Sequence, residues 1–105
     1  MTAATILVIF RSRLRPGTEA EYGPVAERMD ALAAAMPGYV IHKTFTAGDG
    51  ERVTLVEFES EETMRAWREH PEHREAQRLG RERFYSEFRL TVCRPVRKIR
   101  FPEEG

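Results

Sequence analysis

The run ILVIF, which begins at Ile6, constrains the fold of this chain more than any other feature, because it is apolar at every position. Side chains alternate between the two faces of a strand, so Ile6, Val8 and Phe10 share one face while Leu7 and Ile9 share the other. An antiparallel sheet with one solvated face is expected to alternate apolar and polar residues. A sheet that contains this strand therefore needs a cover on both faces.

Hydrophobic periodicity and turn residues predict the remaining elements. Apolar residues recur at helical spacing behind residue 18, β-rich runs flank the hairpin signal GDG, and two short helical patterns follow before the last β-rich run. The predicted elements are a strand at 5–14, a helix at 18–36, strands at 39–47 and 52–60, helices at 61–70 and 71–85, and a strand at 86–99.

Cap and turn residues mark the expected helix boundaries. Thr18 and Glu21 match the capping box S/T-x-x-E, which predicts the start of the first helix. Pro24 lies inside that helical pattern and predicts a kink or a delayed start. Ser60 is a favourable N-cap, and Pro71 is well placed as the first residue of a new helix.

The order β-α-β-β-α-α-β predicts an α+β, ferredoxin-like antiparallel sheet with helices on one face. A second copy of the sheet is the simplest cover for the other face, which predicts a two-fold homodimer. The alternative is a short central strand that is apolar throughout and needs no partner. We expect a single domain over residues 1–98 and a tail at 99–105 that packs on the partner subunit or frays.

Composition disfavours several classes of partner. Seventeen basic and seventeen acidic residues cancel, so no global field favours nucleic acid or an anionic membrane. The N-terminal apolar run is too short for a signal peptide or a membrane span, and we expect a cytoplasmic protein without a membrane partner. The single cysteine, Cys93, excludes an intrachain disulfide and a tetrathiolate zinc site.

RNA-recognition domains share the order β-α-β-β-α-β and are a further alternative. Those domains stack bases on aromatic residues of the third strand, within a glycine-containing basic pattern. The matching run here, RVTLVEFES, has no glycine, a single aromatic residue and two acids. The sequence therefore predicts no nucleic-acid partner.

Two of the three histidines, His70 and His73, are close enough in sequence to raise the question of a metal site. Residues three apart share a helix face, but Pro71 places a helix boundary between these two. Zinc takes three or four protein ligands, and only His42, Cys93 and scattered carboxylates are left to complete such a set. The pattern therefore predicts no metal site and favours a structural or solvent-exposed role for the pair.

One face of the helix predicted at 71–85 is unusually small and polar. It carries His73, Ala76, Gln77 and Gly80, while Arg74, Arg78 and Arg81 fall on the opposite side. This face either lines a cavity, with Trp67 as a flat apolar wall, or packs closely while His73 and Gln77 satisfy backbone groups. Small-ligand sites combine aromatic walls with few polar groups, which favours the cavity.

The chain resembles the antibiotic biosynthesis monooxygenase family, whose members are dimeric α+β barrels. Nearly the whole chain takes part in the resemblance, through ILVIFRSRLRPG, MPGYVIHKTF, VEFESEETMRAWREHPEHREAQRLGRERFY and LTVCRPV. The most specific run is FESEETMRAWREHPEH, in which a strand is followed by a serine-acid cap, a tryptophan and His-Pro-x-His. The fold hosts oxygenases, haem degraders, isomerases and proteins with no assigned activity, so fold alone does not fix function.

The resemblance implies oxidation of a small aromatic ligand by dioxygen, with neither flavin nor metal. A phenol, anthrone or quinol loses a proton, and its electron-rich anion reduces dioxygen, so the protein supplies a base, a hydrogen-bond donor and a dry pocket. We expect no cofactor, His73 as the base and His70 in reserve. The expected substrate-binding residues are Trp67, Gln77, Tyr85 and Phe10. The alternative is a non-catalytic or regulatory ligand-binding dimer.

Haem degradation, another activity in the family, is disfavoured by the residues. Haem-degrading relatives resemble this chain in the tryptophan of the second helix, matched by Trp67. They also need an asparagine on the first strand and a haem-ligating histidine about ten residues after the tryptophan. This sequence contains no asparagine, and Gln77 occupies the position of that histidine.

Overall fold

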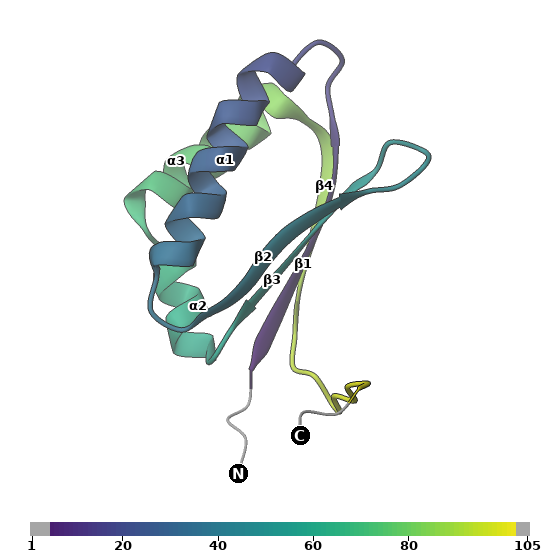
Figure 1. Ribbon diagram of the computed structural model, residues 1–105. Coiled ribbons are helices and arrows are strands. Elements are labelled where there is room, and N and C mark those ends of the chain that lie inside the picture. The colour runs from purple at the N-terminus through teal and green to yellow at the C-terminus, as the bar shows by residue number, and fades with distance from the viewer. Residues whose placement is uncertain (1–4, 103–105) are drawn as a thin grey trace.

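The computed structural model describes residues 5–102; residues 1–4 and 103–105, which the predicted domain and tail include, lie outside the described part of the chain. Figure 1 shows the helices stacked on one face of a curved sheet, with the other face left open. The elements in chain order are β1 (Ile6–Leu14), α1 (Glu19–Ala35), β2 (Tyr39–Thr46), β3 (Arg52–Phe58), α2 (Glu61–Arg68), α3 (Pro71–Leu79), the π-helical segment η1 (Gly80–Phe84) and β4 (Tyr85–Cys93).

The four strands are hydrogen-bonded in the order β2-β3-β1-β4, and all neighbours are antiparallel. This is the predicted ferredoxin-like arrangement, and the α+β fold is confirmed. Val8 pairs with Val56 of β3 on one side and with Val92 of β4 on the other, which fixes the face that each strand residue presents. Residues directly opposite in neighbouring strands share a face, so this register sets the sheet's buried side.

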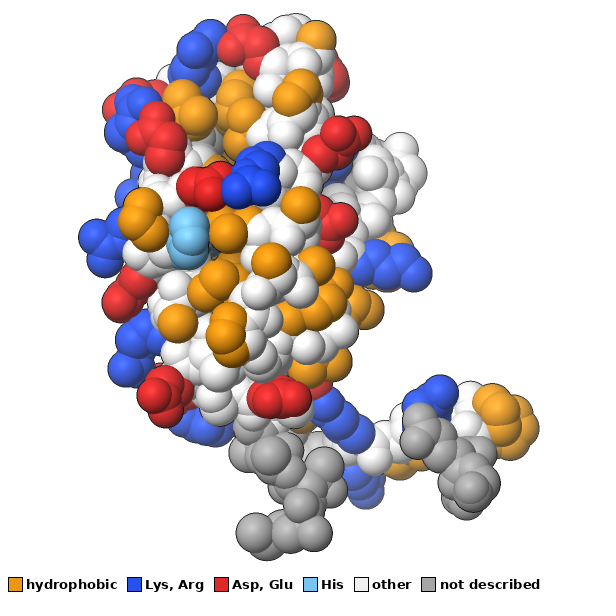
Figure 2. Space-filling view, turned by 60° about the vertical axis from the view of Figure 1, so that its left-hand side comes forward, with side chains coloured by type: hydrophobic (Ala, Val, Ile, Leu, Met, Phe, Trp, Pro, Cys, Tyr) orange, Lys and Arg blue, Asp and Glu red, His pale blue; other side chains and the backbone are white. Residues whose placement is uncertain are grey.

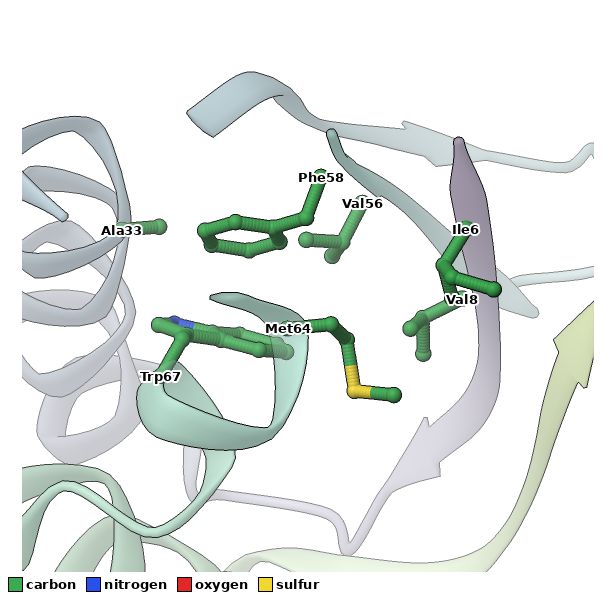
Figure 3. Close-up of a cluster of buried hydrophobic side chains, with 7 residues drawn as sticks. All are labelled: Ile6, Val8, Ala33, Val56, Phe58, Met64 and Trp67. Atoms are coloured by element: carbon green, nitrogen blue, oxygen red, sulfur yellow. The ribbon is translucent and has the colours of Figure 1, made fainter. Parts of the chain in front are cut away.

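A hydrophobic core lies between that side of the sheet and the helices. Ile6 and Val8 are each 1% exposed, and Phe58 is fully buried. Figure 3 shows the ring of Trp67, from α2, lying beside that of Phe58, and the two ring centroids are 5.4 Å apart. The whole cluster comprises Ile6, Val8, Ala33, Val56, Phe58, Met64 and Trp67. Burial of these side chains holds α1 and α2 against the sheet.

The opposite face of the sheet carries a second set of apolar side chains, which no described helix covers. Ile9 pairs with Leu55, and Leu7 lies two residues earlier on the same face. These three side chains are only half-buried in the single chain, and Phe45, farther along this face, is 48% exposed. The two-sided apolar character predicted for β1 therefore extends across three strands.

Two of the predicted helix starts differ in how they are capped. Ser60 caps α2 as expected, since its hydroxyl accepts a hydrogen bond from the Thr63 amide and Thr63 reciprocates. The capping box predicted at Thr18 is wrong: the Thr18 hydroxyl donates instead to the carbonyl of Arg15. Its expected partner Glu21 forms an ion pair with a distant arginine of η1, so neither side chain caps the helix.

Prolines bear on two further predicted boundaries. Pro24 lies within α1 without delaying its start, because the helix already begins at Glu19, one turn earlier. The last strand ends at Cys93 and not at Ile99 as predicted. Cys93 pairs with Leu7 near the start of β1, so little of β1 is left to pair with later residues, and Pro95 has no amide hydrogen to donate to a ladder. Figure 1 shows the following segment projecting away from the sheet.

Among residues 5–102, no helix combines the length and the apolar character that crossing a membrane requires.

Candidate functional site

A cavity of about 510 Å³ lies between the helix-covered side of the sheet and the helices. Its wall is formed by all three α-helices, by η1 and by all four strands, so residues far apart in sequence meet there. Figure 2, which brings the helix side of the molecule forward, shows hydrophobic side chains gathered around a histidine and bordered by charges of both signs. An apolar cavity with a few polar groups is the usual form of a small-molecule site.

Five of the six site residues predicted from sequence line this cavity: His73, Trp67, Gln77, Tyr85 and Phe10. The sixth, His70, does not contribute to the wall. Its Nδ1 accepts a hydrogen bond of 3.1 Å from the Glu72 amide and so caps α3, directly ahead of Pro71. His70 therefore has a structural role in the cap of α3 and lies apart from the other five predicted site residues.

His73 packs against Trp67, with ring centroids 4.3 Å apart. Trp67 is 4% exposed, and both its Nε1 and the Nδ1 of His73 are buried without a hydrogen-bond partner among the described residues. The pKa of His73 is lowered to about 4, mainly by burial; the positive charge of Arg68 also lowers it, while a hydrogen bond with the Arg68 backbone raises it. His73 is therefore neutral at pH 7 but a weak proton acceptor, which makes it less suited to the role of base than we expected.

A second histidine, His42 of β2, lines the same cavity and was not among the predicted site residues. Its Nδ1 lies 3.0 Å from Oδ1 of Asp30, a residue of α1 that also lines the cavity. Burial lowers the pKa of His42, while the charge and hydrogen bond of Asp30 raise it. The structure thus places an imidazole–carboxylate pair in the wall.

Aromatic rings form the end of the cavity near β4. Phe10 packs edge-on against Tyr85 at a centroid distance of 5.3 Å and lies 5.5 Å from Phe88. The Tyr85 hydroxyl donates to the hydroxyl of Tyr22 over 3.3 Å, and burial raises the pKa of Tyr85 above its ordinary value. Tyr85 therefore stays protonated and contributes a ring and a neutral hydroxyl to this aromatic end.

Gly80 makes room for that arrangement. A Cβ atom at this position would lie 2.5 Å from the Tyr85 ring, closer than carbon atoms can approach. At Gly80 the helix also changes from α to π geometry, so the α-helical spacing used to assign residues to faces does not apply beyond Leu79. Arg81 accordingly lines the cavity, with its guanidinium 5.9 Å from the Phe88 ring, and the prediction that it lies on the opposite side is wrong.

Arg68 adds a positive charge to the polar part of the wall. It forms no ion pair with any described carboxylate, and its Nε is buried without a hydrogen-bond partner in the same part of the chain. A half-buried cation that forms no ion pair with a described carboxylate and has a buried, unpartnered Nε favours a ligand that carries or develops negative charge.

Metal ligation has no corresponding arrangement in the described residues, where no three histidine, cysteine or acidic side chains converge to hold an ion.

Comparison with known proteins connects this chain to one family. The family model described as antibiotic biosynthesis monooxygenase matches residues 5–79, which cover β1 through α3. A relative in Bacillus subtilis, the uncharacterized protein YqjZ, is 33% identical over 96 residues, which make up 91% of this chain and 83% of the relative.

Solved structures share the fold at lower sequence identity. Rv0793 from Mycobacterium tuberculosis superposes with a TM-score of 0.81 and 20% identity, over 90% of this chain and 97% of that protein. SnoaB from Streptomyces nogalater, described as a cofactor-independent oxygenase, superposes with a TM-score of 0.77 and 20% identity, over 96% of this chain and all of SnoaB. At this level of identity the likeness concerns the fold.

Proposed function

The chain belongs to the antibiotic biosynthesis monooxygenase family, and we propose that it is a cofactor-independent monooxygenase that oxidises a small aromatic substrate of the quinol or anthrone type with dioxygen. The observation that carries the proposal is the two-ended cavity. One end is a cluster of aromatic rings, and the other holds two histidines, a carboxylate and an arginine. The likeness in fold to SnoaB, described as a cofactor-independent oxygenase, supports the same reaction class.

The chemistry requires only groups that the cavity contains. A histidine takes a proton from the reactive CH₂ group of an anthrone, and the charge left behind spreads onto the carbonyl oxygen as an enolate. The enolate gives one electron to dioxygen, and the resulting radical and superoxide combine to form a C–O bond. The peroxide anion takes the proton back from the histidine. Loss of water then breaks the O–O bond as the second C–H proton leaves, so one oxygen atom becomes the new carbonyl oxygen.

Each part of the wall has a role in this proposal. The rings of Phe10, Tyr85 and Trp67 hold the flat substrate by stacking and exclude water, which strengthens the electrostatic interactions inside. Arg68 stabilises the developing enolate, and Gln77 offers an amide hydrogen bond to the substrate. His70 has no part in it, because its Nδ1 is engaged in capping α3.

The proposal includes a two-fold homodimer built on the open face of the sheet. Leu7, Ile9 and Leu55 lie there half-buried beside the more exposed Phe45. Apolar surface of this kind is stabilised when a second copy covers it, and an isologous contact between two sheets gives a closed assembly.

A non-catalytic or regulatory ligand-binding dimer remains the second candidate. The low pKa of His73 favours it, because a weak base at that position supports binding better than proton transfer. Oxygen uptake separates the two candidates. With anthrone and chelator-treated protein, the monooxygenase is expected to consume one dioxygen molecule for each anthrone oxidised. Binding of anthrone without uptake above the rate in buffer would favour the second candidate.

A further inference from the structure

We propose that His42 is the proton acceptor of the cavity and that Asp30 is the residue that positions it. The inference rests on the proposed function, because it names the base for that reaction and the kind of ligand that the base selects. His42 lies on β2, outside the Trp67–His73 segment in which the sequence analysis places the base.

The first support is the geometry of the pair. His42 Nδ1 lies 3.0 Å from Oδ1 of Asp30, and the His42 side chain is 13% exposed. A carboxylate at Nδ1 keeps the proton on that nitrogen, which leaves the lone pair on Nε2 for a ligand. The same carboxylate stabilises the imidazolium that forms when Nε2 takes a proton.

The second support is the contrast with His73, the other histidine of the wall. Both imidazoles lie in the cavity wall, and burial lowers the pKa of both. At His42 the carboxylate of Asp30 offsets that effect, whereas at His73 only a hydrogen bond with the Arg68 backbone does, and its Nδ1 has no partner among the described residues. Protonated His73 would be a buried cation beside Arg68, while protonated His42 would face a carboxylate. The free energy of proton transfer therefore favours His42.

The third support comes from the charges that surround His42. The cavity wall that it shares carries two carboxylates, Glu27 and Asp30, three cations, Lys43, Arg68 and Arg81, and the second histidine, His73. When His42 takes a proton from a ligand, the anion left behind lies in a wall where cations outnumber carboxylates and where the Nε of Arg68 has no hydrogen-bond partner among the described residues. The ligand class that fits is an aromatic molecule with an acidic hydroxyl or enol, bound as its anion.

A coloured phenol tests the assignment without turnover. 4-Nitrophenol is yellow only as its anion, so a pH titration of its absorbance gives the apparent pKa of the bound probe. Its methyl ether, 4-nitroanisole, has no proton to lose and reports cavity occupancy by quenching Trp67, the single tryptophan of the chain. In the unaltered protein we expect the bound phenol to have a pKa lower than in water by about one unit or more, which is a tenfold shift in ionisation.

His42→Gln should remove most of that shift, because glutamine can still bond to Asp30 but cannot take a proton, and the charge of Arg68 accounts for what is left. Asp30→Asn should reduce it in part, and the matched variant His73→Gln should keep it. Unchanged affinity for 4-nitroanisole and an unchanged melting temperature show that the variants retain the cavity.

Two outcomes in the variants would overturn the assignment while the proposed function stands: a shift that survives undiminished in His42→Gln, or one that is lost only in His73→Gln. A protein that binds 4-nitroanisole without shifting the phenol's pKa would also overturn it. Failure of the unaltered protein to bind either probe would contradict the aromatic cavity itself, and the proposed function with it.

Discussion

Burial of His73 couples the stability of this protein to pH. Its pKa is about 4 in the folded chain, against an ordinary value of 6.5. The unfolded chain therefore binds more protons between these two pH values than the folded chain does. The stability that comes from keeping His73 neutral is fully present above pH 6.5 and is lost as the pH falls toward 4. We expect the free energy of unfolding to fall by up to about 3 kcal/mol across this window on account of His73.

Urea denaturation followed by Trp67 fluorescence at several pH values between 7 and 4 measures that dependence. His73→Phe keeps an aromatic ring against Trp67 but has no proton to bind, so its stability should fall less over the same range. Equal falls in the two proteins would contradict the burial of a neutral imidazole at this position.

At the same scale, His42 shows what the sequence pattern could not predict. Strict alternation from Tyr39 places residue 42 on the opposite face of β2 and away from the core. A register shift between Tyr39 and Ile41 inserts an extra residue, so His42 pairs with Val56 on the buried side. A bulge depends on pairing with a strand that is distant in space, and no local signal at Val40 marks it. His73 and Gln77, on a regular helix, were found because helical spacing alone sets their face.

At the scale of the elements, the two helix starts provide a matched test of capping. Ser60 forms a reciprocal capping box at α2, whereas the Thr18 side chain makes no cap hydrogen bond at α1. Ser60→Ala should reduce the free energy of unfolding by about 1 kcal/mol, and Thr18→Ala by less. Equilibrium unfolding in urea compares the variants directly, and equal losses would show that the Ser60 box does not stabilise α2.

Most elements were predictable because their signals are local. GDG at the hairpin, Pro71 at the start of α3 and the apolar runs of β1 and β3 each act within a few residues. The structure differs from the sequence prediction where contacts between residues distant in sequence determine the geometry. Arg81 lies in the cavity wall because η1 is π-helical, and β4 ends at Cys93 because little of β1 is left to pair with it.

At the scale of the whole molecule, the open face of the sheet predicts the assembly. Ile9→Glu places a charge at the centre of the proposed dimer contact, where burying it without a partner would cost several kcal/mol. We expect this variant to be a monomer of about 12.2 kDa by light scattering, while the unaltered protein has twice that mass. Ala31→Glu, on the exposed side of α1, is the matched control and should stay dimeric. A dimeric Ile9→Glu protein would exclude this face as the contact.

The central claim is that the cavity between sheet and helices is where an aromatic substrate meets dioxygen. Ala76 lines the cavity, so Ala76→Phe fills part of it, whereas Ala66→Phe adds the same ring to the exposed side of α2. Oxygen uptake with anthrone, measured on both variants after melting temperatures confirm folding, tests the claim most directly. We expect Ala66→Phe to match the unaltered protein and Ala76→Phe to lose on the order of tenfold or more, because misplacing a substrate by about 1 Å has large effects on rate. Equal uptake by the two variants would contradict the claim.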